Sequence, residues 1–70
     1  MENDKFYVVL EMKDKNNIFV CATDTFDRAF EIYKYWKEID AFEGNSRKYQ
    51  IKKCTCFPDK TEYSVIYIDN

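Results

Sequence analysis

The sequence contains no histidine and has only one glycine (Gly44) and one proline (Pro58) among its 70 residues. Without histidine the chain lacks the most common general base and metal ligand. A single glycine cannot form the glycine-rich loop that binds phosphates or dinucleotides. A chain this short also has little volume for a deep pocket beside an intact core. We therefore expect no enzymatic activity, no catalytic residue, no metal and no cofactor.

Cysteines are few, and long apolar runs are missing. The three cysteines, Cys21, Cys54 and Cys56, are an odd number, and Cys54-Thr55-Cys56 lacks the two-residue spacer of a zinc knuckle. Residues 1–4 do not show the basic and apolar pattern of a secretory signal. No apolar run approaches the roughly 18 residues of a membrane span. We expect free thiols in strands, a cytoplasmic location and no contact with a membrane.

Aromatic residues, by contrast, are abundant. They make up 19% of the chain, and hydrophobic residues make up 46%. A disordered chain would be poor in aromatic residues and rich in small and polar ones. Large rings supply buried area that a short chain otherwise lacks. The sequence therefore predicts one folded domain over residues 1–70.

A helical pattern covers residues 25–43, a segment without glycine or proline. Its apolar side chains recur at steps of three and four residues and define one face: Phe26, Ala29, Phe30, Tyr33 and Trp36. Asp24 is the predicted N-cap, and Gly44 is the residue at which the helix is predicted to stop.

Segments rich in β-branched and aromatic residues flank this helix, and we expect strands at about residues 5–12, 18–23, 47–57 and 62–68. A polar turn joins each pair into an antiparallel hairpin. In the third strand the alternation slips near Lys52. One extra residue there would bring Tyr49 and Ile51 to the same face as Cys54 and Cys56.

The order of these elements predicts an α+β fold of the type ββαββ, with one long helix on one face of a four-stranded antiparallel sheet. Both faces of this sheet carry apolar side chains, although a solvated face is usually polar. We expect the uncovered face to bind a partner, with its centre at Tyr7, Val9, Phe19 and Cys21.

The polar side of the helix is a second candidate surface. It carries Glu31 and Glu38 together with two aromatic residues, Tyr35 and Phe42. Exposed aromatic residues are enriched among those that contribute most to binding. Carboxylates match a basic groove on another protein. The leading hypothesis is a non-enzymatic protein that binds a larger protein through this side of the helix, or through the sheet face around Tyr7 and Phe19.

Charge is distributed unevenly along the chain. Residues 1–44 carry ten acidic and six basic side chains, and we expect the acidic run on the helix, which ends with Asp40 and Glu43, to form a solvated negative side. Residues 45–70 carry three acidic and five basic ones. The basic group lies on the third strand and consists of Arg47, Lys48, Lys52 and Lys53, with Tyr49 among them.

This basic strand supports an alternative, which is a regulator that binds RNA or single-stranded DNA by phosphate contacts and base stacking. The net charge of −2 disfavours that reading. Another alternative is a homodimer that pairs two sheets or their edges, as a structural or ligand-binding module.

Residues with AT-rich codons, namely Phe, Tyr, Met, Ile, Asn and Lys, account for 34 of the 70 positions. A short acidic chain of this composition and ββαββ layout resembles the small accessory proteins of bacteriophages and mobile elements. Within that group it is similar to anti-CRISPR inhibitors, which block host nuclease complexes by binding them. The resemblance covers the layout of the whole chain and implies a protein inhibitor, without assigning a role to any residue.

Overall fold

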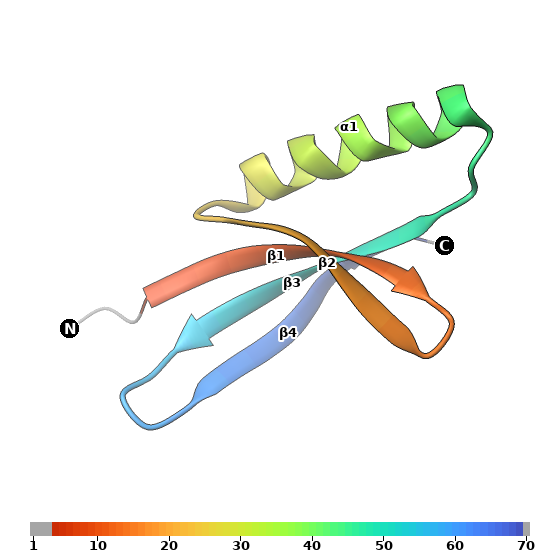
Figure 1. The fold of residues 1–70 in the computed structure, drawn as a ribbon. Coiled ribbons are helices and arrows are strands. Elements are labelled where there is room, and N and C mark those ends of the chain that lie inside the picture. The colour runs from red at the N-terminus through yellow and green to blue at the C-terminus, as the bar shows by residue number, and fades with distance from the viewer. Residues whose placement is uncertain (1–3, 70) are drawn as a thin grey trace.

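The structure, a computed structural model, describes residues 4–69. Four strands and one helix follow in the order β1 (Asp4–Lys13), β2 (Asn16–Thr23), α1 (Phe26–Glu43), β3 (Lys48–Cys56) and β4 (Thr61–Ile68). The strands form one antiparallel sheet in the order β2-β1-β3-β4. Helix α1 lies across one face of this twisted sheet, as Figure 1 shows. The α+β fold with one helix on one sheet face is thereby confirmed. Residues 1–3, which contributed to the expectation about secretion, lie outside the described range.

The two ends of α1 are set by local backbone chemistry. Thr25 is the N-cap, with an extended backbone (φ −134°, ψ 153°), and its hydroxyl accepts a hydrogen bond from the Arg28 N–H at 3.2 Å. The prediction of Asp24 as N-cap was wrong by one residue. Gly44 ends the helix in the left-handed conformation (φ 77°), as predicted, because glycine adopts it without the steric cost of a Cβ.

Two bulges decide which side chains reach the helix. In the pairing of β1 with β2, Val9 lies opposite Cys21 and Leu10 opposite Phe19, so Val20 is an extra residue in β2. Residues directly opposite each other in adjacent strands share a sheet face. The bulge therefore places Cys21 on the helix side and Phe19 on the other side, although their spacing of two residues suggests a common face.

The second bulge lies where the sequence indicated an irregularity, but in the neighbouring strand. The pairing of β3 with β4 shifts between Ile51 and Lys52, and the extra residue is Ile66 of β4. Strand β3 itself pairs regularly with β1. The expected realignment within β3 was wrong: Ile51 lies under the helix, while Cys54 lies on the opposite face.

The core lies between α1 and the sheet. Its buried members are Val9, Ala29, Tyr33, Tyr49 and Ile51, against which Phe26, Phe30 and Trp36 of the predicted apolar stripe pack. Phe26 and Phe30 stack with their ring centres 5.7 Å apart, whereas Phe30 and Tyr33 meet tilted at 5.5 Å and Tyr33 and Tyr49 edge-on at 6.1 Å. Aromatic rings at these separations attract each other beyond the effect of their burial. No helix within residues 4–69 is long and apolar enough to cross a membrane.

Candidate binding surfaces

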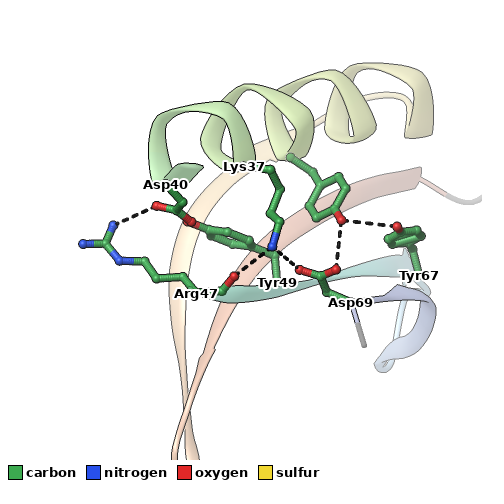
Figure 2. A network of polar contacts seen from close by, with 7 residues as sticks. Lys37, Asp40, Arg47, Tyr49, Tyr67 and Asp69 are labelled. Atoms are coloured by element: carbon green, nitrogen blue, oxygen red, sulfur yellow. Dashed lines mark hydrogen bonds and ion pairs between the residues drawn. The ribbon is translucent and has the colours of Figure 1, made fainter. Parts of the chain in front are cut away.

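Two polar clusters fix α1 on the sheet and so determine which of its sides faces solvent (Figure 2). The first is centred on Asp69, just after β4. Its carboxylate accepts hydrogen bonds from the Tyr33 hydroxyl at 3.0 Å and from the Lys37 ammonium at 2.9 Å. The Tyr67 hydroxyl donates to that of Tyr33 at 3.3 Å, and the backbone N–H of Asp69 donates to the Tyr49 carbonyl at 2.9 Å. The C-terminal strand is thereby connected to the middle of the helix.

The second cluster is centred on Asp40, near the end of α1. Asp40 is only 2% exposed, and its Oδ2 accepts a hydrogen bond of 2.8 Å from the Tyr49 hydroxyl of β3. Its Oδ1 lies 3.6 Å from the Arg47 guanidinium and accepts no hydrogen bond. The expectation that Asp40 belongs to the solvated acidic side of the helix was wrong. Its spacing of four residues from Trp36 continues the buried stripe.

The clusters shift the ionisation of their members. Burial, followed by hydrogen bonds with Tyr67 and Asp69, raises the pKa of Tyr33 above its ordinary value. Burial and the Asp40 carboxylate raise the pKa of Tyr49 to about 12. Burial of Asp69 acts to raise its pKa, but hydrogen bonds from Lys37 and Tyr33 outweigh it and lower the pKa below its ordinary value. Both tyrosines are therefore neutral donors and Asp69 is a charged acceptor at neutral pH.

The clusters also bear on the nucleic-acid alternative. The side chain of Tyr49 is buried, with 1% exposed, and its hydroxyl is bound to Asp40, so its ring is not available for base stacking. Lys52 lies opposite Val8 and Lys53 opposite Tyr7, which places these two lysines on opposite faces of the sheet. Strand β3 is a central strand, not an edge. The structure does not bring Arg47, Lys48, Tyr49, Lys52 and Lys53 together on one surface, so a single site made of these five residues was a wrong prediction.

The exposed side of α1 does bring its predicted residues together. Glu31, Tyr35, Glu38 and Phe42 are separated by four, three and four residues, and all four are exposed. They form one line along the helix, which we call the helix stripe. Phe42 is 94% exposed and Tyr35 is 60% exposed. Basic side chains flank the stripe, but Lys34 lies over the ring of Phe30, with its ammonium 5.6 Å from the ring centre.

The sheet face opposite α1 is the second surface, and Figure 1 shows no helix on that side. We call it the open sheet face. Its apolar side chains, assigned from the pairing of β1 with its neighbours and of β3 with β4, are Phe6, Val8, Leu10, Met12, Phe19, Ala22, Cys54, Cys56, Tyr63, Val65 and Ile68. Lys48 and Lys52 lie on this same face, where they are the cross-strand partners of Met12 and Val8. A hollow of about 220 Å³ on it is lined by Val8, Leu10, Lys52, Cys54 and Tyr63.

The position of the open face corrects the sequence prediction. Tyr7, Val9 and Cys21 lie under the helix, and the ring of Tyr7 meets that of Phe26 at 6.3 Å. Only Phe19, 63% exposed, lies on the open face as expected. Both faces of β1 are apolar, so alternation alone could not distinguish them. Tyr63, Val65 and Ile68 of β4 are further exposed members of this surface, and no sequence pattern indicated them as binding residues.

The cysteines are free thiols: Cys54 is buried, and Cys21 and Cys56 are half-buried. Burial raises the pKa of Cys54 and of Cys21 above the ordinary thiol value, which lowers their reactivity. Within residues 4–69, no three His, Cys, Asp or Glu side chains are grouped in a way that could hold a metal ion.

Comparisons with protein-family models, with curated proteins and with solved structures gave no match to this chain.

Proposed function

We propose that this chain is a small binding protein that inhibits a larger protein by covering a basic groove with its helix stripe. The observation that carries the proposal is Phe42, a large apolar ring that is 94% exposed on a regular helix. Such a ring adds nothing to the core. Aromatic residues of this kind become the central contacts of protein interfaces, because they bury a large area with little loss of side-chain freedom.

The charge around Phe42 indicates the kind of groove. Glu31 and Glu38 lie on the same line of the helix as Tyr35 and Phe42. Carboxylates on a rigid helix can occupy positions that phosphates take in a groove lined by lysine and arginine. A protein that handles nucleic acid has such a groove. The resemblance in size, acidity and layout to anti-CRISPR inhibitors suggests the nuclease complexes of CRISPR systems as the target class.

The mechanism requires only steric block. Since Asp40 and Asp69 fix the helix on the sheet through Tyr49, Tyr33 and Lys37, the stripe is held rigid before binding. A preorganised surface loses little conformational entropy when it binds. No reacting group, metal or cofactor is needed for this function.

The experiment measures DNA cleavage by purified CRISPR nuclease complexes with and without this protein. We expect inhibition that is lost in a variant carrying Tyr35→Ser and Phe42→Ser, and weakened by Glu31→Gln with Glu38→Gln. The matched control is Tyr63→Ser, because Tyr63 is 64% exposed but lies on the opposite side of the molecule. Inhibition that the double serine variant retains in full would contradict a role for the stripe. Absence of inhibition across nucleases of different types would remove this target class.

A further inference from the structure

The helix stripe and the open sheet face have complementary chemistry. The open face is apolar and carries lysines, with Lys52 at the border of its hollow. The stripe presents aromatic rings and carboxylates, and Glu38 and Phe42 are one helical turn apart. A ring placed in the hollow would therefore bring a carboxylate one turn away next to the Lys52 ammonium. This relation connects two surfaces on opposite sides of the same molecule.

The spacing of the charges supports the same arrangement. Glu31 and Glu38 are seven residues apart on α1, which is roughly 10 Å along a helix. Lys48 and Lys52 are four residues apart on β3, which is roughly 13 Å along a strand. Flexible lysine side chains span this difference. Two acidic groups of one copy can thus meet two basic groups of another at the same time.

Other occupants of the open face fit less well. Two copies that packed their open faces together around a two-fold axis would bring the Lys52 side chains of both toward the centre of the interface. Like charges there oppose association. A nucleic acid would meet only two lysines on this face, Lys48 and Lys52, which offer few phosphate contacts.

We propose that copies of this chain associate head to tail, with the helix stripe of one copy bound to the open sheet face of the next. Phe42 occupies the hollow, Glu38 pairs with Lys52, and each bound sheet then has a helix on both faces. Strand β1 of this face has 10 residues and is roughly 33 Å long, so the face is longer than the roughly 27 Å of an 18-residue helix. Because such a contact covers the stripe, a copy whose stripe is bound to another copy cannot at the same time bind a target protein.

The test uses the purified 70-residue chain in sedimentation equilibrium from about 10 µM to about 1 mM, the range in which small interfaces associate. We expect the weight-average mass of the wild type to rise with concentration beyond that of a dimer, and to fall again in high salt. The face variant Lys52→Glu and the stripe variant Tyr35→Ser with Phe42→Ser should each stay at the monomer mass. The matched control is Lys53→Glu, which makes the same charge change one residue away on the opposite sheet face.

A mixture of the two variants provides the decisive measurement. The face variant keeps an intact stripe and the stripe variant keeps an intact face, so an equimolar mixture should form a one-to-one complex that grows no further. A wild type that remains monomeric at about 1 mM would overturn the proposal. A stripe variant that still dimerises would also overturn it, because its dimer would have to form through paired sheet faces. The same holds if Lys53→Glu reduces self-association as much as Lys52→Glu does. Circular dichroism establishes beforehand that each variant is folded. The assay contains no target protein, so its failure leaves the inhibition experiment unaffected.

Discussion

Replacing Asp40 by alanine is the most direct test of how α1 is held on the sheet. The substitution removes the acceptor of the Tyr49 hydroxyl, which is 2.8 Å from Oδ2, in a region where both side chains are almost fully buried. It also removes the contact of 3.6 Å with the Arg47 guanidinium, whose side chain is 43% exposed. We expect the variant to fold, because the aromatic core is unchanged, but with lower stability.

The size of the loss follows from these contacts. A buried hydroxyl left without a partner costs about 1–3 kcal/mol. The Arg47 pair adds less than about 1 kcal/mol, because it is long and solvent screens the guanidinium. Two effects offset part of this loss. The variant no longer buries a carboxylate with one unbonded oxygen, and alanine has a higher helix propensity than aspartate. We therefore expect a net loss of about 2 kcal/mol, or roughly 10 °C in melting temperature for a domain of this size.

Urea unfolding followed by tryptophan fluorescence measures this loss, because Trp36 lies on the same helix. The matched control is Glu38→Ala, two residues away and exposed, which should change the free energy of unfolding by less than about 0.5 kcal/mol. A double-mutant cycle with Tyr49→Phe should give a coupling free energy on the order of 1 kcal/mol. If the two substitutions are additive, or if Asp40→Ala is no worse than its control, the reasoning about this cluster is refuted.

Three further outcomes are expected. The pKa of Asp69 is lowered in the folded state, because hydrogen bonds from Lys37 and Tyr33 outweigh the effect of its burial. Asp69 therefore stabilises the fold above the ordinary aspartate pKa of 3.8, and this contribution is lost as the pH falls through the folded pKa. The free energy of unfolding of Asp69→Asn should fall less steeply below about pH 4 than that of the wild type, and equal acid slopes would contradict this assignment. The pKa of Tyr49 is raised to about 12, so Tyr49 stabilises the fold below its ordinary pKa of 10 and loses this effect as the pH rises toward 12. In the Tyr49→Phe variant the midpoint of urea unfolding should therefore fall less between pH 10 and 12 than in the wild type. Gly44→Ala should destabilise the protein by about 1 kcal/mol in thermal unfolding. The cause is the backbone angle alone, because a Cβ at that position meets no atom within 4 Å, and a variant as stable as the wild type would show that the helix end relaxes freely.

The elements of the fold could be predicted from the sequence because their signals are local. The helix was predicted to within one residue at its start. Its apolar face follows from helical periodicity alone, which spaces Phe26, Ala29, Phe30, Tyr33 and Trp36 by three and four residues. Its end follows from the freedom of Gly44 to adopt positive φ. The helix stripe followed from the same periodicity. Its residues lie on the side of the helix that faces away from the core residues.

Only the tertiary structure decided which sheet face the helix covers. Both faces of β1 are apolar, so the choice depends on long-range packing of rings such as Tyr7 against Phe26. The bulge at Val20 separates Phe19 from Cys21, and such a change in alternation depends on the neighbouring strand.

The polar clusters were also beyond local reasoning. Asp40 lies 9 residues before its partner Tyr49, and Asp69 lies 36 residues after its partner Tyr33. The sequence around a single carboxylate does not indicate whether that carboxylate will be buried. The scarcity of histidine, glycine and cysteine supports only an expectation that the chain has no catalytic or metal site, whereas periodicity placed the helix and the strands. Pairing between distant segments then determined which aromatic rings form the core and which remain available for binding.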